Sequence, residues 1–367
     1  MKARVLVGCF TAVVAAFSSA GRVSAAEQAK IEEVASFPDQ QVTGVAVSKD
    51  NRVFVCFPFW NPNHTISVAE VMKDGTLKAF PDEQWNKNEG DPAKRWVCVQ
   101  SVYVDDTGAL WVIDPAAPML ESVVKGGPKL VKFDLASNQP TQTIAFTEAV
   151  APERSYLNDV RIDTKTGHAY LTDSGLGALA VVDLKTGNGR RLLANQAATK
   201  AEPDVELTVD GLQPKDPKTG KTPRFNADGI ALDSENGYLY WHPLTGHTLW
   251  RAKTEDLRNE QLSEEQLGAK IEKVSKTVAP DGMLAGRDGT IYLTAIEKDA
   301  IVRFDPKTHH EATVAQDKLL QWPDSLAWGA DGWLYVTASQ IHRMPKFNNG
   351  VDQRGGQPFR LLRIKLP

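Results

Sequence analysis

The chain has 367 residues, which is enough for one large domain or two ordinary ones. Hydrophobic residues make up 42% of it and charged residues 24%, a balance typical of a soluble globular protein with a substantial core. The formal net charge of -4 argues against a general nucleic-acid binder, because binding to phosphate backbones requires a basic face.

The first 25 residues have the three-part pattern of a secretory signal peptide. Lys2 and Arg4 precede an apolar run, and small residues ending in Ala25 follow. The apolar run is shorter than the ~20 residues that span a bilayer, so we expect cleavage rather than a membrane anchor. The mature protein, residues 26–367, is therefore expected to be secreted or periplasmic, with no membrane partner.

Two cysteines would remain after Cys9 leaves with the leader, and these are Cys56 and Cys98. An isolated pair in an oxidising compartment is a disulfide candidate. In the repeat pattern described next, Cys56 follows a second strand and Cys98 precedes the first strand of the next copy. Both should lie on one face of adjacent repeats, and a bond requires Cα atoms within about 7 Å.

One short pattern recurs six times along the chain. Each copy is an alternating apolar run, a tight turn with Gly or Asn, and a second apolar run. The copies begin at Thr43, Gln100, Asn158, Asp228, Asp281 and Asp324. The alternation predicts two strands, and the turn residue supplies the positive φ that a hairpin requires. Most copies are followed by a third strand, such as "LVKFDLAS" from Leu130, and by a less regular fourth.

Six repeats of four antiparallel strands predict an all-β fold, the six-bladed β-propeller. A solenoid would keep a more regular period, and a β-sandwich would not show the repetition. The segments "IEEVASF" before the first copy and "PFRLLRIKL" after the last are expected to pair in one blade and close the ring. Residues 26–367 would then form a single propeller domain.

Three insertions interrupt the pattern. Residues 195–225 and 81–94 are rich in turn-forming residues and are expected to be long surface loops. Residues 263–274 begin with an S-x-x-Q capping box, which predicts a short helix on the rim.

The repeat motifs resemble the Yellow/major royal jelly protein family. The matching segments include "RVFVCFPFWNPNHTIS", "LNDVRIDTKTGHAYLTDS", "DGIALDSENGYLYWHPLTGHTLWRA" and "LQWPDSLAWGADGWLYVTASQIHRM", in the family's order. The resemblance implies a six-bladed propeller. It also implies either dopachrome conversion or the binding of biogenic amines in the central channel. A more distant likeness is to regucalcin and gluconolactonase propellers, which hold a divalent cation at the channel mouth.

The first residue of each copy starts an innermost strand, so six polar side chains should ring one mouth of the channel. The next position is small in most copies, and Asp159 is the exception. Converging carboxylates repel one another unless a cation, a proton or solvent intervenes. The pattern therefore predicts a site for a Ca²⁺-like ion or for a substrate ammonium. Alternatively, each Asp could bond to nearby backbone N–H groups and shape its own turn.

In the gluconolactonase-like comparison, Asn158 and Asp228 fall at metal-ligand positions. The Glu expected at the first inner strand is Thr43 here, which weakens the metal-dependent interpretation. A divalent cation is thus a candidate cofactor, and no cofactor is certain.

Aromatic residues end two of the second strands and could line the same mouth. Phe57, Trp60 and His242 are candidates for stacking and cation–π contacts with a ligand, although packing between blades is the alternative. His242 and Asp228 are also the candidate catalytic residues.

These features predict an exported, monomeric propeller whose partner is a small cationic or aromatic ligand bound at the acidic mouth. Thr43, Gln100, Asn158, Asp228, Asp281 and Asp324 would contribute to that site. The alternative is an enzyme, either a dopachrome tautomerase-like isomerase or a metal-dependent lactonase. The sequence leaves this choice open.

Overall fold

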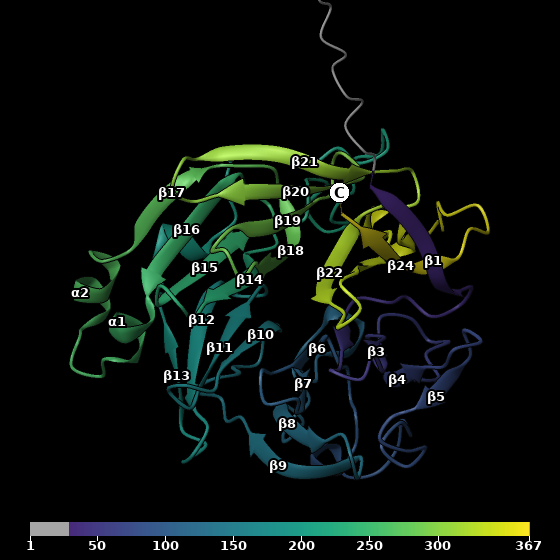
Figure 1. Cartoon of the computed structure of the whole chain (residues 1–367), viewed down its shortest axis with the longest axis horizontal. Coiled ribbons are helices and arrows are strands. Elements are labelled where there is room, and N and C mark those ends of the chain that lie inside the picture. Colours follow the sequence, from purple (N-terminus) through teal and green to yellow (C-terminus); the bar gives the residue numbers. More distant parts are fainter. Residues whose placement is uncertain (1–28, 367) are drawn as a thin grey trace, which may run out of the picture.

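The computed structural model describes residues 29–366 and shows six four-stranded antiparallel sheets arranged around a central axis (Figure 1). The six innermost strands, one from each sheet, neighbour one another in a closed circle. The predicted six-bladed propeller is confirmed. The predicted leader, residues 1–25, lies outside the described residues.

The strands of the first three blades follow chain order from the axis outward. Blade 1 consists of β2 (Val45–Val47), β3 (Val53–Cys56), β4 (Val68–Val71) and β5 (Leu77–Ala79). Blade 2 consists of β6 (Ser101–Val104), β7 (Leu110–Asp114), β8 (Lys129–Asp134) and β9 (Gln139–Ala145). Blade 3 consists of β10 (Leu157–Asp163), β11 (His168–Asp173), β12 (Ala178–Asp183) and β13 (Gly189–Leu192).

The remaining blades follow the same order, except that the last one takes its outer strand from the start of the chain. Blade 4 consists of β14 (Ala227–Asp233), β15 (Tyr238–Pro243), β16 (Thr248–Lys253) and β17 (Glu272–Lys276). Blade 5 consists of β18 (Pro280–Ala285), β19 (Ile291–Ala295), β20 (Ala300–Asp305) and β21 (His310–Gln316). Blade 6 consists of β22 (Pro323–Trp328), β23 (Leu334–Ala338), β24 (Phe359–Lys365) and β1 (Lys30–Phe37).

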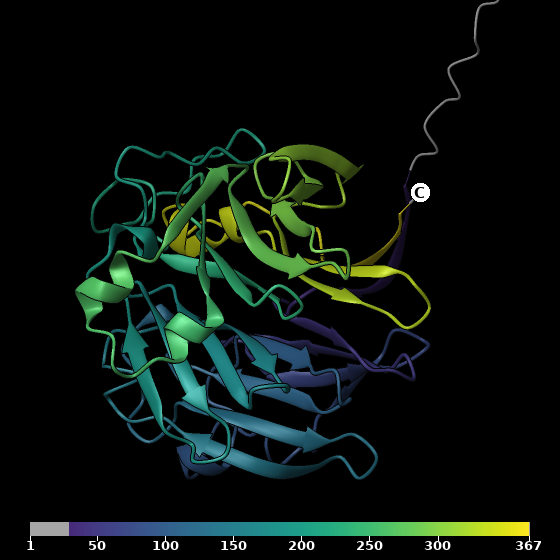
Figure 2. The same ribbon diagram turned by 60° about the vertical axis from the view of Figure 1, so that its left-hand side comes forward.

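The ring is closed by the two ends of the chain. Strand β1 pairs antiparallel with β24, from Lys30 opposite Lys365 to Phe37 opposite Phe359. Figure 2 shows the purple N-terminal strand beside the yellow C-terminal one. The pairing of β1 with β24 gives the last sheet its fourth strand. The last blade therefore contains strands from both ends of the sequence, and this closes the ring. The pairing predicted from the two flanking segments is confirmed.

A residue with positive φ occupies the tight turn between the first two strands of every blade. These residues are Asn51, Gly108, Gly167, Gly237, Gly289 and Gly332, with φ between 60° and 95°. Gly and Asn adopt this left-handed conformation at the lowest cost, so the repeated turn signal does set the hairpins.

Helices are few and lie outside the blades. Ser263 forms the predicted capping box with Gln266 at the start of α2 (Glu264–Gly268). The helix is shorter than predicted, because the chain from Glu272 onward pairs as the outer strand β17. A second helix, α1 (Thr254–Arg258), follows β16 directly. Single 3₁₀ turns occur at Pro92–Lys94, Pro118–Leu120, Ala197–Thr199, Ile341–Arg343 and Pro345–Phe347. No helix within residues 29–366 is long and apolar enough to cross a bilayer.

Candidate functional site

A β-bulge lies at the first two residues of the repeat in four of the blades. The register between the innermost strand and its neighbour shifts there in β10, β14, β18 and β22. The bulged pairs are Asn158–Asp159, Asp228–Gly229, Asp281–Gly282 and Asp324–Ser325. A bulge disturbs the regular alternation of side chains and re-aims them. The strict alternation assumed from the sequence therefore does not hold at these positions.

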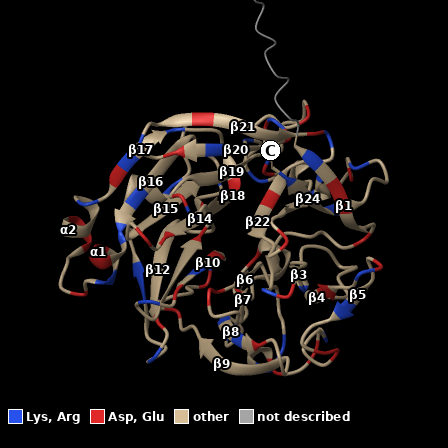
Figure 3. Ribbon diagram, viewed as in Figure 1, with Lys and Arg blue, Asp and Glu red and all other residues tan. Residues whose placement is uncertain are grey.

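Four carboxyl groups from four blades converge at the bulges, and we call Asp159, Asp228, Asp281 and Asp324 the acidic ring. All four residues are buried, with 4–7% of their surface exposed. After burial itself, the charges of Asp281, Asp159 and Asp324 are what raise the pKa of Asp228 well above its usual range. Figure 3 shows acidic segments of β18 and β22 beside the central axis. The acidic ring is therefore one electrostatic unit rather than four separate turns.

Asp228 and Asp281 form a directly paired couple within the ring. Their carboxyl groups are hydrogen-bonded to each other, so one of them carries a proton. Burial raises the pKa of Asp281 to about 7, although a hydrogen bond from Trp322 opposes the rise. The Trp322 indole Nε1 donates to Asp281 Oδ2 at 2.5 Å. Asp281 therefore gains or loses its own proton near neutral pH, while the raised pKa of Asp228 keeps the proton between the two carboxyl groups.

Asp324 provides the unsatisfied acceptor of the ring. Burial, together with the charges of Asp281 and Asp159, raises its pKa well above the usual range. Its Oδ2 atom is buried and has no hydrogen-bond partner among the described residues. Buried polar atoms are nearly always paired in folded proteins, so an orphaned carboxyl oxygen is a natural contact point for a ligand.

The other side of the mouth is neutral and aromatic. Thr43 Oγ1 donates to the Gln100 carbonyl oxygen at 2.9 Å. Gln100 Oε1 accepts from the Tyr156 hydroxyl at 2.8 Å, and Tyr156 in turn accepts from Trp60 Nε1 at 2.8 Å. Trp60 is therefore connected to the predicted ring position Gln100 through Tyr156. Tyr156 precedes the third repeat by two residues and so lies outside the pattern that predicted the ring positions.

A lid covers this mouth, and we define it as residues 195–225 together with residues 339–358. Leu207, Val209 and Phe347 of the lid pack in one buried apolar cluster with Trp60, Tyr156 and Trp322. Since Trp322 and Tyr156 also touch the mouth residues, the lid lies directly over the ring. The predicted surface loop 195–225 is therefore partly a buried cover, and its polar composition hides that role.

Two of the predicted ligand-binding residues lie elsewhere. Phe57 packs edge-on against Phe37 of the closing strand, with ring centroids 5.1 Å apart. His242 lies between blades 4 and 5, where its Nδ1 is 2.7 Å from the Pro243 carbonyl oxygen and its Nε2 is 3.3 Å from Thr277 Oγ1. Burial lowers the pKa of His242 to about 4. Both residues serve packing between strands and blades, which was the alternative for these aromatics.

Asn158 is buried beside Asp159 in the bulge of β10. The residue of this blade whose charge raises the pKa of the other three carboxyl groups is Asp159. Asp159 was visible in the sequence as the exception to the small-residue position, but its contribution depends on the bulge.

The predicted disulfide between Cys56 and Cys98 is wrong, because both thiols are free and buried. Cys56 Sγ donates to the Gln100 carbonyl oxygen at 3.1 Å, across to the next blade. In other blades a threonine hydroxyl at the same place makes this link, from Thr172 to the Asp228 carbonyl and from Thr337 to the Thr43 carbonyl. Cys56 thus replaces an inter-blade threonine, while the Cys98 thiol lies 3.8 Å from the Tyr156 hydroxyl.

A metal ion is poorly served by this arrangement. Among residues 29–366, no group of three or more His, Cys, Asp or Glu side chains is arranged to hold one. Ligation of a Ca²⁺-like ion by Asn158 and Asp228 therefore stays a prediction.

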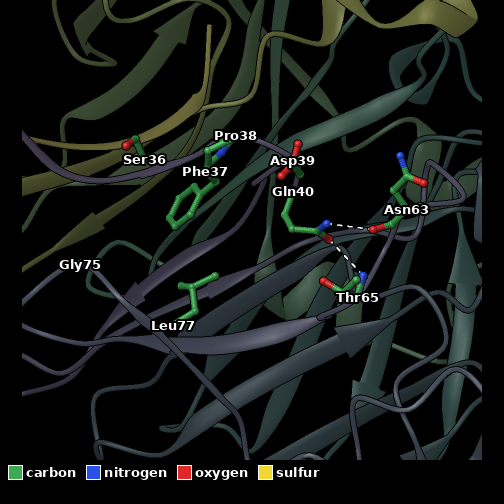
Figure 4. Close-up of a pocket in the computed structure, with 9 residues that line it drawn as sticks. All are labelled: Ser36, Phe37, Pro38, Asp39, Gln40, Asn63, Thr65, Gly75 and Leu77. Carbon is green, nitrogen blue, oxygen red and sulfur yellow. Dashed lines mark hydrogen bonds between the residues drawn. The ribbon is translucent and has the colours of Figure 1, made fainter. Parts of the chain in front are cut away.

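Two of the open hollows on the surface of residues 29–366 are not lined by any ring residue. The first, of about 500 Å³, lies between the closing strand and blade 1 (Figure 4). There Gln40 Nε2 donates to the Asn63 carbonyl oxygen at 3.0 Å. The second, of about 400 Å³, lies between blades 4 and 5, and its wall includes Lys276, Glu297 and Glu311.

Comparison with known sequences places the chain in a family. The family model described as "Major royal jelly protein" matches residues 97–363. The chain belongs to this family. Major royal jelly protein 3 of Apis mellifera is 23% identical over 233 residues, covering 61% of this chain and 41% of the relative. Protein yellow of Drosophila pseudoobscura pseudoobscura is 22% identical over 255 residues, covering 64% and 45% respectively. The matched region of the chain thus covers less than half the length of each of these curated relatives.

Solved structures with this fold include enzymes and a calcium-binding protein. A gluconolactonase from Xanthomonas campestris has a TM-score of 0.55 at 12% identity, over 92% of this chain and 90% of that one. A luciferin-regenerating enzyme has a TM-score of 0.55 at 11% identity, over 92% and 95%. Regucalcin from Agrobacterium tumefaciens, described as calcium-binding, has a TM-score of 0.51 at 15% identity, over 91% and 95%. At these identities the likeness shows the fold alone.

Proposed function

We propose that this member of the major royal jelly protein family binds a small organic cation at the acidic ring. The observation that carries the proposal is the convergence of four buried carboxyl groups, one of which, Asp324, leaves an oxygen without a partner. Burying several acids in contact costs free energy unless positive charge or protons compensate. Buried acids with strongly raised pKa values cluster at functional sites, so this cost in free energy points to a binding or catalytic role.

The chemistry of the mouth favours an ammonium group attached to an aromatic or apolar body. The ammonium can donate to Asp324 Oδ2 and displace the proton that Asp281 binds below about pH 7. Trp60 and Tyr156 stand on the neutral side of the same mouth, where aromatic faces can contact the ligand body. The ligand would therefore be held by charge on one side and by apolar contact on the other.

Export, a small-molecule partner and a monomeric state belong to the same proposal. The leader pattern at residues 1–25 supports export. An extracellular or periplasmic binding protein of this kind would meet its ligand directly in solution.

One observation favours a second candidate, an isomerase that moves a proton on a dopachrome-like substrate. The Asp228–Asp281 couple holds a shared proton, and burial brings the pKa of Asp281 to about 7, which suits general acid–base catalysis. A lactonase has less support, because the likeness to gluconolactonase shows the fold alone and the described residues lack a metal-binding group.

Calorimetric titration with 2-phenylethylamine tests the binding proposal. We expect saturable binding to the wild type and at least about tenfold weaker binding to Asp324→Asn, since the amide has the same size but cannot release a proton and become negatively charged when the ammonium binds. The exposed Asp106→Asn is the matched control and should bind as the wild type does. The uncharged analogue 2-phenylethanol should not bind.

Equal affinity for the amine and the alcohol, or for the wild type and Asp324→Asn, would contradict the proposal. A parallel assay with dopachrome addresses the second candidate. Turnover that disappears in Asp228→Asn would show an enzyme rather than a pure binding protein.

A further inference from the structure

A chain of three hydrogen-bonded side chains on the neutral side of the mouth ends in the amide of Gln100. Trp60 Nε1 donates to the Tyr156 hydroxyl at 2.8 Å, and that hydroxyl lies 2.8 Å from Gln100 Oε1. All three residues are buried, with 5–9% of their surface exposed. Gln100 comes just before β6, at the repeat position that holds an aspartate in blades 4, 5 and 6. Its amide therefore belongs to the same mouth as the acidic ring.

The donors and acceptors of this chain follow one direction. An indole N–H is a donor and never an acceptor, so the Tyr156 oxygen accepts from Trp60. The hydroxyl hydrogen of Tyr156 then donates to Gln100, and the atom that receives it is the amide oxygen Oε1. Cys98 Sγ, 3.8 Å from the same hydroxyl, is a much weaker acceptor. The network thereby turns the other end of the amide, the nitrogen Nε2, away from Tyr156.

The amide nitrogen of Gln100 has no acceptor in the part of the chain that the structure describes, residues 29–366. The main chain of Gln100 is fully paired, because its N–H donates to the Ile113 carbonyl and its carbonyl accepts from Thr43 and Cys56. Nε2 is not completely buried, so a ligand in the mouth can reach it. A ligand that displaces solvent from the mouth would leave its two N–H donors unpaired unless the ligand supplied an acceptor.

We propose that Gln100 is a specificity-determining residue of this mouth, and that it favours amines whose aromatic ring carries a hydrogen-bond acceptor. This inference rests on the proposed function, because it concerns the ligand of the same site. Asp324, which would hold the ammonium, lies in blade 6, whereas Gln100 lies at the start of blade 2, with blade 1 between them. The acceptor is therefore expected at the end of the ligand far from the ammonium. An oxygen there would pair with Nε2, and a methylene in its place would not.

Two amines of matching shape test this claim. 2-(4-Methoxyphenyl)ethylamine has an oxygen on the ring where 2-(4-ethylphenyl)ethylamine has a methylene. By calorimetry, the wild type should bind the methoxy compound at least about fivefold more tightly, which is the ratio expected of one neutral hydrogen bond. Gln100→Met keeps the length of the side chain and removes the amide, so this variant should bind the two amines equally. The exposed Gln261→Met is the matched control and should keep the wild-type preference.

Tyr156→Phe gives a second test, because it keeps the amide of Gln100 and removes the group that orients it. The amide can then turn its oxygen toward the ligand, so the preference for the methoxy compound should shrink. A residue with a packing role alone would change both affinities alike and leave their ratio unchanged. Equal affinity of the wild type for the two amines, or an undiminished preference in Gln100→Met, would overturn this inference and leave the proposed function standing. If the wild type binds neither amine, the proposed function fails and the inference falls with it.

Discussion

Asp281 sets the pH dependence expected of the site. Burial raises its pKa to about 7, against an unfolded value near 3.8. A cation competes with the proton that Asp281 itself binds below about pH 7, so ligand affinity should rise by up to about tenfold per pH unit below pH 7 and level off above it. Titration of 2-phenylethylamine at a series of pH values between 5.5 and 8.5 measures this. Affinity that is constant or falls over the lower half of that range would contradict the role of Asp281.

The two described cysteines should be unreactive thiols in the native protein. Burial raises the pKa of Cys98 to about 12 and raises that of Cys56 as well, so almost no thiolate is present at neutral pH. Ellman's reagent should modify neither in native protein lacking the leader, and both after denaturation. Failure of denaturant to release thiols without a reductant would show that the cysteines are paired after all.

Replacing Cys56 by threonine extends this argument. Thr172 and Thr337 make the corresponding link to the next blade in their own repeats. Cys56→Thr should therefore melt within a few degrees of the wild type, whereas Cys56→Ala loses the contact to the Gln100 carbonyl and should melt lower. Thermal unfolding followed by circular dichroism separates the two. Equal losses for both variants would mean that the inter-blade hydrogen bond has no role.

Individual site residues could be predicted from the sequence when they occupy the same position in each copy of the repeat. Asp228, Asp281 and Asp324 share one alignment position, and a closed ring brings that position together. Asp159 was assigned to the small-residue position, because alternation cannot anticipate a bulge that re-aims two consecutive residues. Trp322 and Tyr156 lie just before their repeats begin, where no periodic pattern reports on the direction of a side chain.

At the scale of elements, the strands could be predicted from the alternation of apolar residues along the sequence. The structure of the insertions could not be predicted in this way. The hairpins have a local signal, since six turns carry a residue with positive φ. The segment 195–225 reads as a polar loop, yet Leu207 and Val209 within it are buried against Trp322. A few apolar residues in a polar stretch give no periodicity, so their burial depends on contacts with distant parts of the chain.

The lid should open more readily when the polar contacts between its two segments are removed. Asp210 Oδ2 in the first lid segment accepts from Arg343 Nη2 at 2.8 Å and lies 3.1 Å from His342 Nε2 in the second. His342 in turn stacks on Trp322, with ring centroids 5.7 Å apart, which couples the lid to the ring. In Arg343→Gln, amide hydrogen exchange across residues 205–222 should become about tenfold faster, because Asp210 loses its charged donor.

The exposed Arg303→Gln is the control for this experiment, and it should leave exchange in residues 205–222 unchanged. A faster association of 2-phenylethylamine with Arg343→Gln should accompany the faster exchange, since the ring lies beneath the lid. Exchange that stays at the wild-type rate would show that the apolar contacts alone hold the lid closed.

At the scale of the whole molecule, closure of the propeller is what creates the site. Residues of the acidic ring come from repeats far apart in the sequence, and only a complete circle of innermost strands brings them together. The circle is completed by β1 and β24, from opposite ends of the chain. The repeated pattern made this architecture predictable from the sequence. A single blade cannot bury its apolar faces alone, so six similar repeats must pack against one another. The cover over the mouth was not predictable, because it is built from the insertions that interrupt the repeat.

The central claim is that the acidic ring is the place where a cationic ligand binds. A crystal structure of the protein grown with 2-phenylethylamine at about pH 8 tests it most directly, because Asp281 is then largely ionised. We expect the ammonium nitrogen to lie within about 3 Å of Asp324 Oδ2, with the phenyl group toward Tyr156 and Trp60. An amine bound instead in the hollow between blades 4 and 5, or in the hollow beside the closing strand, with the ring unchanged beneath its lid, would contradict it.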